Sequence, residues 1–386
     1  MILTPELLGA AMIIVIATHH LWLAKRVRPR LAVESPRTWP SVAALRPIRG
    51  RDPGARENLD ALLAMSYPGR IEFLFLLDDA TDPSYALVEA AIAAHPDRTA
   101  RVVLTGEPPP NRTGKIHKMI LGSELVTADV LAFSDSDTRP QPNALRELVA
   151  LLESDPHNGI AFAPKVAVAS DAQTGDVGYE LLVNAWYGAA IDRLADERGH
   201  VPFAMGQFMI IRASALDAIG TMRAAEGELV DDMFLGRRML ETGFANVIAT
   251  TRVPLVIGGM RLVEFLPVFR KWLFFAQSGL PDGFKTAGWL RAVAGFGTWA
   301  TVIAGIAISS ATVLATGLAA LALFTLSQVR LNRLIGGAGV ALRHYWVAAA
   351  LPFIAAGVAL STKLNHTVTW RGRRYSLDDT GRLRAA

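Results

Sequence analysis

Three long stretches without a charged side chain constrain the fold of this chain more than any other feature. Residues 7–24, 292–329 and 344–362 contain no Asp, Glu, Lys or Arg. A helix that crosses a bilayer needs roughly 20 predominantly apolar residues. Residues 292–329 are numerous enough for two short helices with a turn at Ser309–Ser310. We therefore predict an integral membrane protein with one N-terminal transmembrane helix and about three C-terminal ones.

The charges that flank the first stretch predict its orientation. Glu6 is the only charged side chain before it, whereas the basic run KRVRPR, from Lys25 to Arg30, follows it. Cytoplasmic flanks carry an excess of Lys and Arg, so residue 25 onward is expected in the cytoplasm. A cleaved signal peptide, the alternative, would have a basic segment before the apolar stretch. We expect a protein of the inner (cytoplasmic) membrane.

The C-terminal end leaves two topologies open. Three crossings that start in the cytoplasm would leave the tail outside. Its sequence WRGRR (370–374) is strongly basic, however, which favours the cytoplasm. Either one apolar stretch is re-entrant or the short tail breaks the rule. We expect three crossings.

Residues 38–260 have the pattern of a cytoplasmic α/β domain. Apolar runs at 42–48, 71–77, 101–104 and 129–133 alternate with segments of helical spacing at 57–65, 85–95, 114–126 and 143–154. This alternation is typical of a mostly parallel sheet covered on both faces, which binds ligands beyond the carboxyl ends of its strands. We divide the chain into an anchor (1–30), this domain (38–260), an interfacial amphipathic segment (261–288), transmembrane helices (289–362) and a basic tail (363–386).

Composition excludes several kinds of site. The chain has no cysteine, which rules out disulfides and thiolate metal sites. Its net charge of +4 is small, and no Lys- and Arg-dense stretch is interleaved with aromatic residues. Nucleic acid is therefore not an expected partner, whereas anionic lipid headgroups are.

Two carboxylates, Asp135 and Asp137, follow the predicted strand 129–133 in the sequence FSDSD. Like charges this close need a partner, and a hard divalent cation that also binds substrate phosphates is the natural one. A solvated acidic turn is the alternative. The strand-end position, and further carboxylates in LLDDATD (76–82) at the end of another strand, favour a divalent-cation site.

A second pair, Asp231 and Asp232, precedes a predicted helix that contains Arg237 and Arg238. Acidic residues at this position stabilise a helix through its dipole. A helix N-terminus that faces a crevice is also a place to hold a general base. Both interpretations remain open for this pair.

The apolar stretch from Leu262 to Phe284 is interrupted by Arg270, Lys271 and Trp272. It predicts an amphipathic helix in the membrane interface with snorkelling cations. A second role for these cations is to face a diphosphate leaving group.

In their order and spacing, these motifs resemble those of the GT-A nucleotide-sugar glycosyltransferases, and within them the ceramide glucosyltransferases and their bacterial lipid and hopanoid relatives. The likeness covers nearly the whole chain. Its elements are RGRDPGARENLDALLAMSYP (49–68), LDDATDPS (77–84), TGKIHKM (113–119), SDSD (134–137), the glycine of AMGQFM (Gly206), VDDMF (230–234) and TWRGRRY (369–375). The resemblance implies the GT-A fold, a Rossmann-like, mostly parallel sheet.

The resemblance also implies roles for particular residues. A UDP-sugar would lie across the carboxyl edge of the sheet, with Pro47, Asp79 and Lys115 at the nucleotide. Asp135 and Asp137 would hold Mg²⁺ or Mn²⁺ on the diphosphate. The proton of the acceptor hydroxyl would go to Asp232, with Asp231 beside it. One displacement at the anomeric carbon would invert its configuration.

The chain departs from the family pattern at its basic motif, usually Q/R-x-x-R-W. Here it reads Val268 to Trp272, with Lys271 in place of Arg. Lysine keeps the charge but loses bidentate phosphate geometry, so Arg270 is expected to share the role. Asp231 stands where the family often has Glu, and Asp137 completes a D-x-D that the eukaryotic ceramide enzymes lack.

The predicted function is transfer of a glucose-type sugar from a UDP-sugar to a lipid hydroxyl such as that of ceramide, at the bilayer surface. Glycosylation of diacylglycerol or a hopanoid, and a processive polysaccharide synthase, remain alternatives. A nucleotide-binding membrane scaffold is the alternative that is not an enzyme.

Overall fold

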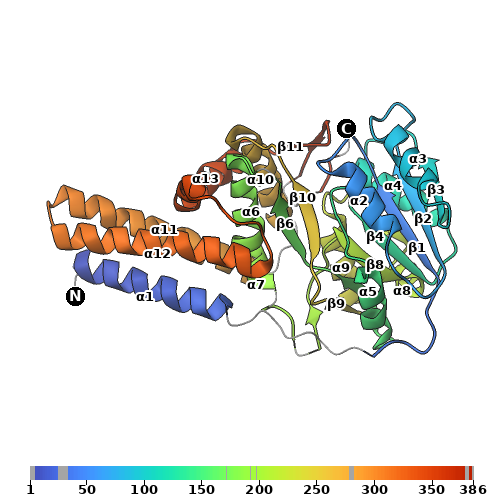
Figure 1. Ribbon diagram of the computed structural model, residues 1–386, viewed down its shortest axis with the longest axis horizontal. Coiled ribbons are helices and arrows are strands. Elements are labelled where there is room, and N and C mark those ends of the chain that lie inside the picture. Colours follow the sequence, from blue (N-terminus) through green and yellow to red (C-terminus); the bar gives the residue numbers. More distant parts are fainter. Residues whose placement is uncertain are drawn as a thin grey trace.

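The computed structural model describes residues 5–24, 34–170, 172–191, 193–196, 198–277, 282–378 and 382–384. The predicted basic run Lys25–Arg30 lies outside them, as do residues 278–281 of the predicted interfacial segment. Figure 1 shows an α/β domain at one end of the molecule and a bundle of long helices at the other.

The domain is built on an eight-stranded mixed sheet in the order β3-β2-β1-β4-β8-β5-β9-β7. The strands β1 to β4 are parallel to one another, as the sequence predicts, and β8 pairs antiparallel with both β4 and β5. The bounds are β1 (Val42–Pro47), β2 (Ile71–Leu77), β3 (Thr99–Leu104), β4 (Val130–Ser134), β5 (Asn158–Phe162), β7 (His200–Val201), β8 (Phe208–Arg212) and β9 (Ala245–Ile248).

Both faces of the central strands are apolar, because alternate side chains of a strand point to opposite faces and helices cover each. Leu45 and Leu76 pack on one face with Ile116 of α4 (Gly114–Glu124). The neighbouring Ala44 and Phe75 belong to a second core on the other face. That face is covered by α2 (Ala55–Leu63), α3 (Tyr85–Ala93) and α5 (Ala144–Glu153).

A second layer joins this domain to the long helices. It contains the parallel pair β6 (Lys165–Ala169) and β10 (Val253–Ile257), and the amphipathic helix α10 (Leu262–Gln277). It also contains α6 (Thr174–Glu180), which continues through the π-helix η1 (Leu181–Gly188) into α7 (Ala189–Ile191). Three further helices lie between β8 and β9 in the chain: α8 (Ala213–Ala218), the 3₁₀ helix η2 (Met222–Ala225) and α9 (Asp231–Glu241).

Three C-terminal helices are long and apolar enough to cross a membrane, as predicted: Gly288–Ala307, Ala311–Ile335 and Leu342–Leu364. They belong to α11 (Asp282–Ala307), α12 (Ala311–Ile335), and η3 (Leu342–His344) with α13 (Tyr345–Leu364). The predicted turn at Ser309–Ser310 separates α11 from α12, and the hydroxyl of Ser310 accepts a hydrogen bond from the N–H of Val313.

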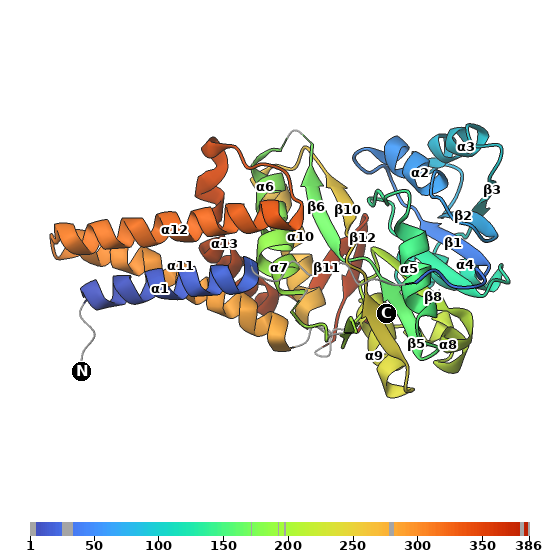
Figure 2. The same cartoon turned by 60° about the horizontal axis from the view of Figure 1, so that its bottom comes forward.

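The N-terminal helix α1 (Pro5–Ala24) has a shorter apolar part, Gly9–Ala24, so its crossing of a membrane remains a prediction. In both views α1, α11 and α12 run side by side as one bundle (Figures 1 and 2). The helix α13 runs across the base of this bundle, where it packs on α11 and α12 as well as on α10 and α6.

The C-terminal tail folds against the α/β domain. Residues 367–376 form a hairpin of β11 (Thr367–Trp370) and β12 (Arg373–Ser376). This hairpin contacts the domain directly, since Arg371 binds Asp52 and Arg373 binds Asp78. The contact favours the alternative in which one apolar stretch does not complete a crossing, and the number of crossings stays a prediction.

Candidate functional site

A cavity of about 560 Å³ opens beyond the carboxyl ends of β1 and β4. Eight of the predicted site residues line it: Pro47, Lys115, Asp135, Asp137, Asp231, Asp232, Lys271 and Trp272. These residues come from separate parts of the sequence, and the sheet edge brings them together. Asp79 and Arg270 do not line the cavity.

The loop that carries Asp135 and Asp137 is held by a buried arginine that the sequence did not reveal. Arg46, on β1, is fully buried and donates to the hydroxyl of Ser134 at 2.9 Å and the carbonyl of Thr138 at 2.8 Å. These two residues bracket the acidic pair. Burial lowers the pKa of Arg46 to about 10, so the guanidinium stays charged at neutral pH.

The acidic pair has the properties of a cation site. Partial enclosure, and then the charges of Asp135 and Asp52, raise the pKa of Asp137 to about 6. Its Oδ1 atom has no hydrogen-bond partner within the described part of the chain. No cluster of three or more metal-ligating side chains occurs among the described residues. A divalent cation held by this pair alone would take its remaining oxygen ligands from substrate or water.

Lys115 connects the two acidic motifs. Its Nζ lies 3.0 Å from Oδ1 of Asp135 and 3.3 Å from Oδ2 of Asp231. Although burial alone would lower the pKa of Lys115, these carboxylates and that of Asp232 raise it above its usual value. Burial raises the pKa of Asp231 to about 6. Lys115 is thus a permanent cation that holds Asp231 and Asp135 in place.

Asp232, unlike Asp231, makes no ion pair with Lys115. Backbone N–H groups instead orient the carboxylate of Asp232. The N–H of Gly206 donates to Oδ2 at 2.6 Å and the N–H of Met233 to Oδ1 at 2.8 Å. Gly206 lies so close that an added Cβ would be 3.1 Å from the Cβ of Asp232. Asp232 is therefore fixed in direction while it lines the cavity, which is the arrangement that a general base needs.

The basic motif on α10 divides between two sides of the helix. Lys271 and Trp272 line the cavity, and the indole N–H of Trp272 donates to the hydroxyl of Tyr179 at 3.1 Å. Arg270 instead donates to the carbonyl oxygens of Thr367 and Asn365. In this structure Arg270 anchors the segment that leads into the C-terminal hairpin.

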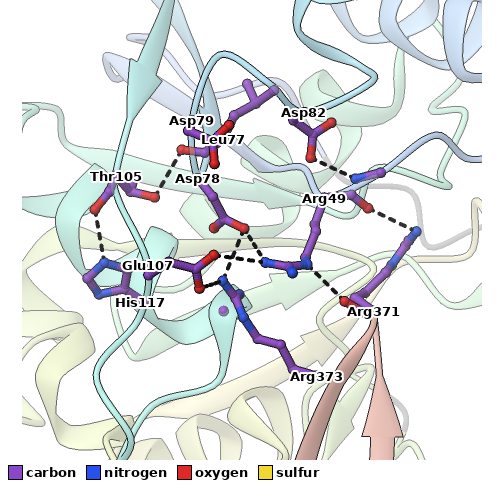
Figure 3. Close-up of polar contacts among 12 residues, drawn as sticks. Arg49, Leu77, Asp78, Asp79, Asp82, Thr105, Glu107, His117, Arg371 and Arg373 are labelled. Carbon is purple, nitrogen blue, oxygen red and sulfur yellow. Dashed lines mark hydrogen bonds and ion pairs between the residues drawn. The ribbon is translucent and has the colours of Figure 1, made fainter.

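Of the adjacent residues Asp78 and Asp79, the first points inward. Asp78 is buried and accepts a hydrogen bond from Lys118. It also accepts hydrogen bonds from Arg49 and Arg373 (Figure 3). The carboxylate of Asp79 is exposed and accepts from the N–H of Thr81 at 2.7 Å. The role predicted for Asp79 at the nucleotide remains a prediction. Lys118, from the TGKIHKM motif, forms a buried ion pair with Asp78.

The C-terminal hairpin supplies two arginines that sequence reasoning did not place in the site. Arg371 and Gly372 form its turn with φ angles of 50° and 75°, as a tight two-residue hairpin turn requires. The guanidinium of Arg371 binds both carboxylate oxygens of Asp52 and lies 3.9 Å from Asp137. Arg373 also binds Glu107 (Figure 3). The signals in the sequence were the basic tail and the TWRGRRY element of the family resemblance.

The opposite wall of the cavity is apolar. Val183, Tyr187 and Ile191 line it at intervals of four residues along η1 and α7, together with Val268 and Phe275 of α10. The other side of η1 is tied to α12, where Asn184 donates to Asn332 at 2.7 Å and the indole of Trp186 donates to Gln328. One cavity therefore joins a charged end at the sheet to an apolar wall beside the long helices.

Comparisons with known proteins agree with this architecture. The family model described as glycosyl transferase family 21 matches residues 6–383. Ceramide glucosyltransferase 1 of Caenorhabditis elegans is 22% identical over 249 residues, 64% of this chain and 52% of that protein. Ceramide glucosyltransferase of Candida albicans is 28% identical over 125 residues, 30% of this chain and 23% of that protein. The chain spans about half the length of the nematode relatives.

Among solved structures, the chain is similar in fold to a mannosyltransferase from Pyrobaculum calidifontis, described in complex with GDP-Man and Mn²⁺. The TM-score is 0.52 at 18% identity, and the match covers 93% of this chain and 99% of that one. This likeness confirms the predicted GT-A fold.

Proposed function

Because the chain belongs to glycosyl transferase family 21, we propose that it is a membrane-bound, inverting glycosyltransferase. It moves a glucose-type sugar from a UDP-sugar to a lipid hydroxyl, such as that of ceramide. The similarity to ceramide glucosyltransferases supports ceramide over diacylglycerol or a hopanoid as the acceptor.

The observation that carries this proposal is the two-sided character of the single cavity. A sugar nucleotide needs cations and hydroxyl-binding groups, whereas a lipid needs an apolar surface that continues toward the bilayer. The cavity offers Lys115, Asp135 and Asp137 at the sheet and Val183 and Tyr187 at the helices. A soluble acceptor would gain nothing from the apolar wall.

In the proposed reaction Asp232 accepts the proton of the lipid hydroxyl as the oxygen attacks the anomeric carbon. The two backbone N–H groups that bind Asp232 keep its carboxylate directed into the cavity and lower the entropic cost of reaching the reactive geometry. Asp231, paired with Lys115, positions the start of α9 rather than taking the proton. The C–O bond to the diphosphate breaks as the new glycosidic bond forms.

The leaving diphosphate carries negative charge that the site must stabilise. Held by Asp135 and Asp137, Mg²⁺ or Mn²⁺ would supply Lewis-acid stabilisation of this group. Lys271 lines the same cavity and adds a positive charge, with Trp272 beside it. Arg270 contributes through the hairpin that it anchors, which presents Arg371 to the acidic pair. On the nucleotide side, Pro47 lines the cavity, and Asp79 keeps its predicted role at the outer edge.

We further propose a topology in which α1, α11 and α12 cross the membrane and α13 lies in its interface beside α10. The α/β domain and the C-terminal hairpin are then both cytoplasmic. This arrangement gives two crossings between the domain and the tail, which agrees with their direct contact.

The proposal is tested with purified protein in lipid nanodiscs that contain ceramide, diacylglycerol or a hopanoid, each incubated with a panel of UDP-sugars and Mn²⁺. Mass spectrometry of the lipid fraction is expected to show one added hexose on ceramide, and none after EDTA treatment. Sugar transfer without any lipid product would contradict the proposal.

Two rivals predict different products. A processive polysaccharide synthase would give a ladder of lengths on a gel, whereas the proposed enzyme gives one sugar per lipid. A nucleotide-binding scaffold would bind UDP without consuming any UDP-sugar.

A further inference from the structure

Two lysines of the cavity lack an acidic contact partner. Lys165, at the start of β6, is 4% exposed, and Lys271 lies across from it on α10. Within the described residues, neither ammonium has a hydrogen bond or an ion pair. Each lies over aromatic rings instead. The Nζ of Lys165 is 3.5 Å from the ring centre of Trp272, and that of Lys271 is 5.6 Å from the ring centre of Trp370.

The other two lysines that line the cavity behave differently. Lys115 pairs with Asp135 and Asp231, and Lys118 pairs with Asp78. Their burial is compensated inside the protein. A buried ammonium without such a partner costs free energy, and a cation–π contact recovers only part of it. The cost for Lys165 is evident from its pKa, which burial lowers to about 7 although the carboxylate of Asp232 opposes this effect.

A buried cation that faces a cavity without a protein partner indicates an anionic ligand. Lys165 lines the same cavity as Asp232, Asp135 and Asp137. It therefore shares with the predicted base and the acidic pair the space in which the bond between sugar and diphosphate would break. A cation at this place would meet negative charge that grows as the diphosphate leaves.

We propose that Lys165 binds the phosphate next to the transferred sugar, and that Lys165 and Lys271 together form a two-cation subsite for the leaving diphosphate. This inference rests on the proposed function. It assigns a role to Lys165, which no sequence motif suggested, and it explains why Trp272 lines the cavity: its ring holds the uncompensated ammonium in place before the donor binds.

The experiment measures binding of UDP and of uridine to the full-length protein in detergent with Mn²⁺ and without lipid acceptor, by isothermal titration calorimetry. Lys165→Met is expected to weaken UDP binding roughly 10- to 100-fold, the loss typical of a charge-assisted contact. Uridine, which lacks phosphate, is expected to bind both proteins equally. Lys165→Arg is expected to stay within a few-fold of the unmodified protein for UDP.

Two controls separate a binding role from a structural one. Lys363→Met removes an exposed lysine at the end of α13 and is expected to change nothing. The thermal midpoint of ligand-free Lys165→Met is expected to equal or exceed that of the unmodified protein, because an uncompensated buried charge is replaced by an apolar side chain. Failure of Lys165→Met to fold would contradict the premise that Lys165 is an uncompensated cation. UDP binding would then be measured with Lys165→Gln.

The outcomes are distinguishable. Unchanged UDP affinity in Lys165→Met, with intact binding by the unmodified protein, overturns the inference alone. If the unmodified protein fails to bind UDP, the proposed function itself fails. If Lys165→Met binds UDP normally but loses retention on vesicles of phosphatidic acid, the anion belongs to a lipid headgroup and the assignment to the donor is wrong.

Discussion

Replacing Gly206 by alanine tests whether the orientation of Asp232 limits catalysis. The added Cβ would lie 3.1 Å from the Cβ of Asp232, 3.1 Å from Nζ of Lys115 and 3.2 Å from Oδ2 of Asp232. Carbon atoms in favourable contact are about 3.5–4.0 Å apart. Both groups must therefore move by roughly half an ångström. Gly206 is not among the glycines with a positive φ, so its backbone accepts alanine without strain.

The expected loss follows from the contacts that this shift weakens. The 2.6 Å hydrogen bond from the N–H of Gly206 to Asp232 is charge-assisted, and such bonds contribute about 1.5–3 kcal/mol. A misplacement of about 1 Å costs up to roughly 100-fold in rate. We expect kcat to fall by about 10- to 100-fold. The KM for the UDP-sugar should change less than kcat does, because Lys115 is the only residue assigned to the nucleotide among the nearest neighbours of the added Cβ.

The assay compares kcat and KM of Gly206→Ala with those of Gly357→Ala in purified protein. Gly357 lies on α13, and a Cβ there would meet nothing within 4 Å. It thus controls for alanine substitution in general. An unchanged kcat in Gly206→Ala would refute the argument that Asp232 is positioned by this close contact, and a loss confined to KM would place the effect on donor binding instead.

Three further outcomes are expected. Asp232→Asn should lower kcat by about 10²- to 10⁴-fold with little change in donor KM, and turnover like that of the unmodified protein would remove its assignment as base. Because the pKa of Asp137 is raised to about 6 and a metal ligand must be deprotonated, apparent Mn²⁺ affinity should fall about fivefold from pH 6 to pH 5; a pH-independent affinity would exclude this residue as a ligand. Since the chain lacks cysteine, Ser309→Cys and Arg374→Cys report topology cleanly with an impermeant maleimide on sealed vesicles, and labelling of both from the same side would contradict the proposed crossings.

Most of the α/β domain was predictable because its signals are local. The apolar runs 42–48, 71–77 and 129–133 correspond to β1, β2 and β4, and the intervening helical patterns correspond to helices. In a parallel sheet both faces are buried, so a strand reads as a continuous apolar run that a sequence displays directly. The turn at Ser309–Ser310 was equally local.

The site was only partly predictable, because the direction of a side chain depends on packing. Asp78 and Asp79 are adjacent and chemically identical, yet only Asp78 reaches Lys118. Arg46 interrupts an apolar strand and gave no sign that it holds the acidic loop. Lys165 likewise stood in an ordinary strand. Each of these side chains contacts residues that are far away in the sequence, so no local pattern could predict the contact.

The C-terminal tail shows the same division at the largest scale. Its basic composition was plain from the sequence and favoured the cytoplasm, whereas three crossings would place it outside. Length and hydropathy determine that a helix can enter a bilayer. Whether α13 crosses depends also on what it packs against, here α11 and α12 as well as α10 and α6. The sequence by itself determined the elements, the acidic motifs and the membrane association, since these depend on neighbouring residues. Only the tertiary structure decided that Arg371 of the tail and Asp137 of the sheet edge face each other in one cavity, because contacts between distant segments arise from the packing of the whole chain.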